Sequence, residues 1–132
     1  MKSSQLNNSG NPPTASASSS RDNPCFDSDT QIAALEAIAD DGISYLLPYA
    51  QFLYAERISN PALEKEPDAP PEKMLLHFAK ADVVVLGSGF KRLEQTIQKF
   101  ELKFVKSADR RLAATLNTHI AAVTVTLTKE NV

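Results

Sequence analysis

Two hydrophobic periods occur next to each other in the second half of the chain, and this combination constrains the fold more than any other feature. Over residues 90–101 apolar side chains recur at the spacing of one face of a helix. The members of this stripe are Phe90, Leu93, Ile97 and Phe100. On both sides of the stripe the pattern changes to the alternation that half-buried strands show. The sequence therefore predicts an α+β fold: a small mixed or antiparallel sheet of four to six short strands, with helix 90–101 on one face.

The predicted strands follow from the alternation. Residues 74–86 alternate up to Phe78, break at polar residues 80–82 and continue as a valine run, which indicates a β-hairpin. Residues 102–106 alternate apolar side chains with lysines, and residues 120–128 alternate them with threonines. Each of these two segments therefore predicts a strand with one solvated face.

The aromatic segment 43–58 contains a proline, Pro48, which argues against one long helix. We predict two short strands or one bent edge strand here, with Phe52 and Tyr54 on the same side. A helix over residues 48–57 is the alternative, because proline is tolerated in the first turn of a helix.

A second, N-terminal helix is predicted over about residues 30–40. Ile32, Leu35 and Ile38 fall on one helical face in this segment. The preceding Asp–Thr pair can cap the start of such a helix, and Gly42 can end it.

The domain organisation follows from composition. Residues 1–25 are rich in Ser, Asn, Pro and Ala and contain no apolar period. Such a segment buries too little apolar surface to offset the entropy cost of ordering, so we expect a disordered tail. Residues 26–132 are long enough for a single small α+β domain with one core. A loop is expected at residues 59–73, where four prolines and a run of charges exclude a regular element.

The chain holds one cysteine, Cys25, and two histidines that are far apart in sequence. A lone cysteine excludes an internal disulfide framework and a zinc site built on cysteines, so we predict no metal and no cofactor. We see neither the apolar stretch of a secretory signal nor an apolar run of about 18 residues that would span a membrane. The expected location is the cytoplasm, away from any membrane.

The sequence GSG follows the valine run and precedes the predicted helix, as phosphate-binding loops do. A dinucleotide fingerprint would need a third glycine where Arg92 stands, and the Walker spacing is also absent, so no standard nucleotide fold is predicted. Cations at a helix start oppose the helix dipole, and a bound anion would reverse that cost. The resulting anion-binding hypothesis covers Gly87, Ser88, Gly89, Lys91 and Arg92. The favoured interpretation is simpler: the glycines form a strand-to-helix turn that needs positive φ.

Charge is distributed unevenly along the chain. Residues 1–72 hold four Lys and Arg against eleven Asp and Glu, whereas residues 73–132 hold ten against five. We favour two halves that pack against each other, and the alternative is a polyanionic partner for the basic half. The residues of that polyanion-binding hypothesis are Lys99, Lys103, Lys106, Arg110 and Arg111. Since no surface aromatic is interleaved with them, a solvated basic face is the favoured interpretation of segment 91–111.

No serine, histidine or carboxylate stands in a pattern typical of catalysis, so we predict no catalytic residues, which argues against an enzyme. We predict a non-catalytic binding or adaptor domain whose partner is another, unidentified protein. The tyrosines Tyr45, Tyr49 and Tyr54 are expected to leave apolar area exposed for such a partner. A binder of polyanions or nucleic acid is the first alternative. A small enzyme acting on a phosphate-bearing ligand at the GSG turn is the second.

Overall fold

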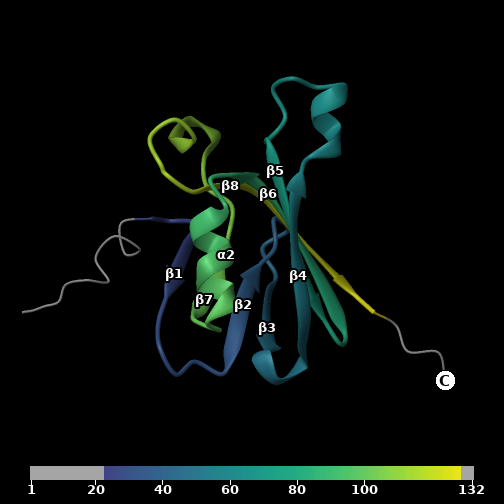
Figure 1. Ribbon diagram of the computed structural model, residues 1–132, viewed down its shortest axis with the longest axis vertical. Helices are drawn as coiled ribbons and strands as arrows, with labels where there is room; N and C mark the ends of the chain where they lie inside the picture. The colour runs from purple at the N-terminus through teal and green to yellow at the C-terminus, as the bar shows by residue number, and fades with distance from the viewer. Residues whose placement is uncertain (1–22, 129–132) are drawn as a thin grey trace, which may run out of the picture.

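The computed structural model describes residues 23–128, which form two four-stranded sheets and one α-helix (Figure 1). Sheet A consists, in spatial order, of β1 (Phe26–Ser28), β7 (Leu102–Val105), β2 (Ala34–Ile38) and β3 (Ser44–Pro48). Sheet B consists of β4 (Phe52–Ser59), β5 (Glu72–Phe78), β6 (Ala81–Ser88) and β8 (His119–Leu127). The remaining elements are helix α2 (Lys91–Gln98) and the 3₁₀ turns η1 (Tyr49–Gln51), η2 (Pro61–Glu64) and η3 (Arg110–Leu112). The predicted α+β class is confirmed, but a single sheet of four to six strands was too small an expectation.

Sheet B is antiparallel throughout and contains the predicted hairpin as β5 and β6. Met74 lies opposite Val85 and Leu76 opposite Val83, and all four of these side chains are buried. The alternation of this segment therefore has the orientation that the sequence predicts. Strand β8 extends the sheet along β6, in agreement with the strand expected over residues 120–128.

The predicted N-terminal helix over residues 30–40 is wrong, because this segment forms strand β2. Leu35, Ala37 and Ala39 are buried on one side of it. Leu35 fits both a helical and an alternating period, so the local pattern was ambiguous. Pairing decides the matter: β2 is antiparallel to β3 and parallel to β7, so hydrogen-bonding neighbours on both sides favour the extended backbone.

The aromatic segment forms two strands, β3 and β4, joined by η1, so the alternative of a helix over residues 48–57 is wrong. The prediction that Phe52 and Tyr54 share a side is also wrong. Phe52 lies opposite Phe78 and Tyr54 opposite His77, with the register shifted between them by a β-bulge. The extra residue of a bulge reverses the side on which the following residues project. Phe52 consequently packs with the core and Tyr54 faces outward.

Helix α2 is shorter than the predicted 90–101 segment, and its residues Leu93 and Ile97 are buried in the hydrophobic core. Phe90 precedes its first residue and is also fully buried. Phe100 differs, because the helix ends before it and its φ is 56°. Phe100 is 48% exposed, and its ring stacks on Tyr49 with ring centroids 5.2 Å apart. The apolar stripe therefore ends at Ile97.

The expected domain boundaries fall largely at the limits of the structure. The predicted tail, residues 1–25, lies outside the described residues except for its last three. Of these, Asn23 donates a 2.9 Å hydrogen bond to the carbonyl of Thr118, and Cys25 is buried. The proline-rich segment forms η2 and the irregular chain between β4 and β5. Among residues 23–128 no helix has the length and apolar character needed to cross a membrane.

Candidate functional site

The GSG turn connects β6 to α2, and a carboxylate of the protein itself occupies the start of the helix. Glu72, the first residue of β5, accepts hydrogen bonds from the backbone N–H groups of Gly89 (3.0 Å) and Phe90 (3.1 Å). These amides precede the first helical turn, where backbone donors lack partners within the helix. Glu72 therefore provides both the hydrogen-bond acceptors and the negative charge that a helix N-terminus favours.

Both glycines of this turn are required by close backbone contacts. A Cβ on Gly87 would lie 1.9 Å from the carbonyl oxygen of His119, at the bulge between β6 and β8. Gly89 has a φ of +69°, and a Cβ there would lie 1.8 Å from the carbonyl oxygen of Asn117. The turn thus needs glycine for steric reasons whether or not a ligand binds there.

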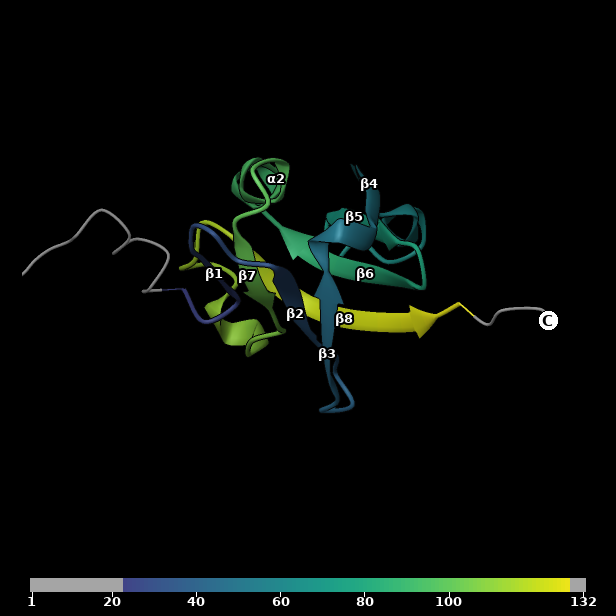
Figure 2. The ribbon, with the colours of Figure 1, turned by 90° about the horizontal axis from the view of Figure 1, so that it is seen from below.

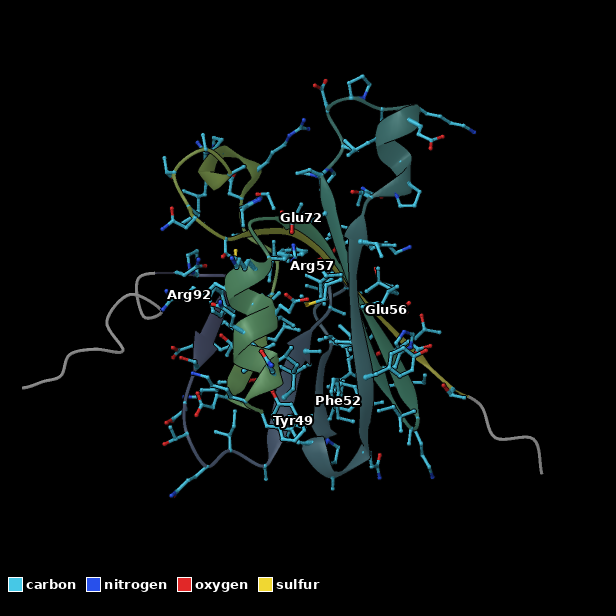
Figure 3. All side chains as sticks on the ribbon, viewed as in Figure 1. Tyr49, Phe52, Glu56, Arg57, Glu72 and Arg92 are labelled. Carbon is cyan, nitrogen blue, oxygen red and sulfur yellow. The ribbon has the colours of Figure 1, made fainter. Side chains whose placement is uncertain are left out.

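Arg57 of β4 connects this cap to the helix. Its guanidinium lies 3.7 Å from the carboxylate of Glu72 and 3.3 Å from that of Glu94. In Figure 3 Arg57 points from β4 toward α2, whereas Glu56 projects to the opposite side of the strand. The arginine balances two carboxylates near the helix start and joins three elements: β4, β5 and α2.

The cations of the anion-binding hypothesis, Lys91 and Arg92, are exposed on the first turn of α2. Arg92 lies on the side of the helix away from Arg57 (Figure 3). Ser88 lies at the end of β6, paired with His119. Anion binding at this turn stays a prediction, and an external anion would have to displace Glu72 from the two amides.

The five residues of the polyanion-binding hypothesis are all exposed but are distributed over the length of the molecule. Lys99 follows the C-terminal end of α2, whereas Arg110 and Arg111 belong to η3. The end of α2 and η3 lie at opposite ends of the molecule (Figure 1). Arg111 is also paired with Asp109, at 2.9 Å, and this contact lowers the pKa of that carboxyl. Lys103 lies on β7 and Lys106 just after it. The hypothesis stays a prediction.

A cleft of about 710 Å³ lies between the proline-rich loop and the loop that contains η3. The residues that line it include Glu66 and Asp68 of the proline-rich loop, Arg110 of η3, and Ser88 and His119 of sheet B. His119 is buried, and its Nε2 lies 3.1 Å from the carbonyl oxygen of Asp109 and 3.2 Å from that of Ala108. The imidazole ring thereby links the loop that contains η3 to the end of sheet B.

A second ordered surface lies on the side of sheet B that faces away from α2, and we call it the outer face. The strand registers arrange it as three rows of four residues, each row crossing β4, β5, β6 and β8 in that order. The rows are Ile58, Lys73, Leu86 and Ala122; then Glu56, Leu75, Val84 and Thr124; then Tyr54, His77, Asp82 and Thr126. Figures 1 and 2 show no helix or strand of residues 23–128 lying over this side.

Five of the twelve residues of the outer face are aliphatic, and its two central residues, Leu75 and Val84, are half-buried. A polar group occupies one end. The two ring nitrogens of His77 lie 2.9 Å from carboxylate oxygens of Glu56 and Asp82, and the ring of Tyr54 stacks on the imidazole at 4.3 Å. Burial acts to lower the pKa of His77, but the hydrogen bonds and charges of the two carboxylates outweigh it, so the pKa is raised. The imidazole of His77 therefore keeps its proton to a higher pH than a free histidine does.

Both edges of sheet B are protected, unlike its outer face. The β4 edge carries a bulge at Leu53 and two charged residues, Glu56 and Arg57. At the β8 edge Val123 accepts a hydrogen bond from the backbone N–H of Asp40, and its own N–H donates to the Asp40 carboxylate. Bulges, charges and covered edges prevent strand addition from other chains. The outer face carries neither kind of protection.

No family model, curated protein or solved structure matches the chain.

Metal binding and nucleophilic catalysis by a cysteine have little support within the described part of the chain. Residues 23–128 contain no group of three His, Cys, Asp or Glu placed to hold a metal ion. Burial raises the pKa of the Cys25 thiol, whose Sγ accepts a hydrogen bond from the backbone N–H of Ile120. A buried thiol of this kind is not poised as a nucleophile.

The sequence interpretation missed the residues that organise both sites. The alternation of β5 already places Lys73, Leu75 and His77 on one side, so part of the outer face could have been found. The contribution of β4 could not, because the bulge shifts its register. No local sequence pattern identifies Glu72 as a capping residue, because it caps a helix that begins 19 residues later.

Proposed function

We propose that this protein is a non-catalytic protein-binding domain and that the outer face of sheet B is its binding surface. The observation that carries the proposal is an ordered antiparallel sheet face with five aliphatic residues and the aromatic Tyr54, and with no covering element among residues 23–128. Sheets normally bury one apolar face and solvate the other with polar residues. Here both faces of sheet B carry apolar side chains, so the second one supports a role in binding.

The composition of the outer face suits a protein partner. Leu75, Val84 and Leu86 form an apolar centre, and charged or hydroxyl side chains surround it on both sides. An apolar centre within a polar border is the usual anatomy of a protein interface. Tyr54, which is 53% exposed, adds an aromatic side chain of the kind that dominates binding energy at interfaces. Of the three tyrosines expected to be exposed, Tyr49 is buried and Tyr45 half-buried.

Site-specific photo-crosslinking in the source cells tests this proposal. A photoreactive amino acid replaces Val84 in one variant and Leu46 in the control, because Leu46 is an exposed apolar residue of sheet A. We expect a discrete protein adduct from position 84 and none from position 46. The adduct partner is then purified, and its binding to the parent and to Leu75→Lys is measured directly. Equal labelling at both positions, or binding that Leu75→Lys leaves unchanged, would contradict the proposal.

A further inference from the structure

We infer that the partner of the outer face is a second copy of this chain, which forms a weak symmetric dimer by stacking the two outer faces with a twofold axis parallel to the strands. This inference rests on the proposed function, since it specifies the occupant of the same surface. It follows from the residues that such an axis would place opposite each other.

An axis parallel to the strands, between β5 and β6, keeps each row of the outer face aligned with the same row of the second copy. Strand β5 then faces β6 of the partner, and β4 faces β8. Leu75 faces Val84 of the other copy and His77 faces Asp82, each twice by symmetry. Apolar residues meet at the centre and the histidine meets a carboxylate at one end, whereas Lys73 faces Leu86 of the second copy at the other end. The complementarity therefore lies in the centre and at the His77 end of the face.

The other in-plane axis, perpendicular to the strands, gives an unfavourable arrangement. Each strand then faces its own symmetry mate and the row order is reversed. Glu56 would face Glu56 of the second copy, and Lys73 would face His77. Like charges opposite each other cost free energy when they lose water. Charge therefore selects the strand-parallel axis.

The area of the face indicates the class of dimer that it can form. Four strands spaced by about 4.8 Å and three rows spaced by about 6.8 Å cover roughly 400 Å² of flat area per copy. This is about half of the 800 Å² per partner that is typical of stable complexes, so the dimer belongs to the weak class. Packed sheets also rotate by about 30°, which separates the corners and keeps the central Leu75–Val84 contacts.

One contact of this arrangement can be tested without disturbing the fold. Glu56 faces Thr124 of the second copy, whereas within one chain these residues lie on opposite edge strands, about 14 Å apart at the usual strand spacing. Thr124 is exposed, so both of its charged variants should fold. Thr124→Lys adds a cation opposite Glu56 of the partner, and Thr124→Glu adds a like charge there.

Sedimentation equilibrium of the purified full chain and its variants measures the effect. We expect the parent to dimerise over about 10 µM to 1 mM, in keeping with its small interface. Thr124→Lys should bind itself more tightly than Thr124→Glu by roughly two- to thirtyfold, because each dimer contains two exposed ion pairs. In a Glu56→Gln background this difference should disappear. Circular dichroism shows that each variant is folded.

The inference is overturned if the parent and Thr124→Lys both stay monomeric over this range, or if Thr124→Lys and Thr124→Glu associate equally. The proposed function fails separately. A monomeric protein whose position 84 crosslinks to a different protein would refute self-association and retain the outer face as the binding surface.

Discussion

Replacement of Glu72 by alanine should destabilise the protein through loss of the cap on α2. The carboxylate accepts two backbone hydrogen bonds at the helix start and lies 3.7 Å from Arg57. Loss of an N-terminal cap costs about 0.5–2 kcal/mol, and hydrogen bonds to a charged group are worth about 1.5–3 kcal/mol. Because the Glu72 side chain is 28% exposed and water can partly replace it, we expect a loss of about 1.5–3 kcal/mol.

The free energy of unfolding is measured by urea titration followed by circular dichroism. A loss of this size corresponds to a decrease of about 8–15 °C in the melting temperature of a domain of about 100 residues. Glu72→Gln removes the charge and keeps one acceptor oxygen, so it should lie between the parent and Glu72→Ala. The matched control is Glu66→Ala, an exposed carboxylate of the proline-rich loop, which should change stability by less than about 0.5 kcal/mol. A Glu72→Ala variant as stable as this control would refute the capping role.

The core assignment of α2 predicts that Leu93→Ala, at a fully buried position, costs about 2–5 kcal/mol in the free energy of unfolding. Lys99→Ala, at an exposed position, should cost less than about 0.5 kcal/mol, and urea midpoints in the reverse order would show that the helix faces are misassigned. The pKa of His77 is raised in the folded protein, so the charged imidazole stabilises the fold. This stabilisation is fully present below the unfolded pKa of about 6.5, and it is lost as pH rises through the folded pKa. His77→Gln should therefore reduce the loss of stability between pH 5.5 and pH 8.5 relative to the parent, and an unchanged pH profile would mean that the two carboxylates do not hold the charged imidazole.

Local patterns predicted the elements whose neighbours are close in sequence. The β5–β6 hairpin and α2 are examples, because alternation and a helical stripe directly reflect which side of each element is buried. Strand β2 could not be predicted in this way. Its buried residues fit two periods, and the pairing that selects the strand involves β7, which lies far along the chain. The pattern of the sequence reports burial, whereas the partner of a strand is a property of the whole fold.

The candidate site, like the fold, could be predicted from local sequence patterns only in part. The GSG turn stands out in the sequence because glycine is visible as a residue type, yet its backbone contacts explain the glycines without a ligand. Glu72, which caps the helix, looks like any other carboxylate at the end of a charged loop. The outer face depends on the bulge at Leu53, because that single extra residue directs Tyr54 and Glu56 outward. A register shift of this kind leaves no mark in the alternation of β4.

Because β7 lies between β1 and β2, sheet A cannot be completed until residues near the C-terminal end of the chain are available. Hairpins β2–β3 and β5–β6 join neighbours in sequence and can form early, but β1 has no partner until residues 102–105 have left the ribosome. Until then Phe26 and Leu35 lack the strand that completes their surroundings. Contacts between distant segments slow folding, so the rate-limiting step should be the insertion of β7. A nascent chain stalled before residue 102 would hold the hairpins of both sheets and no closed core.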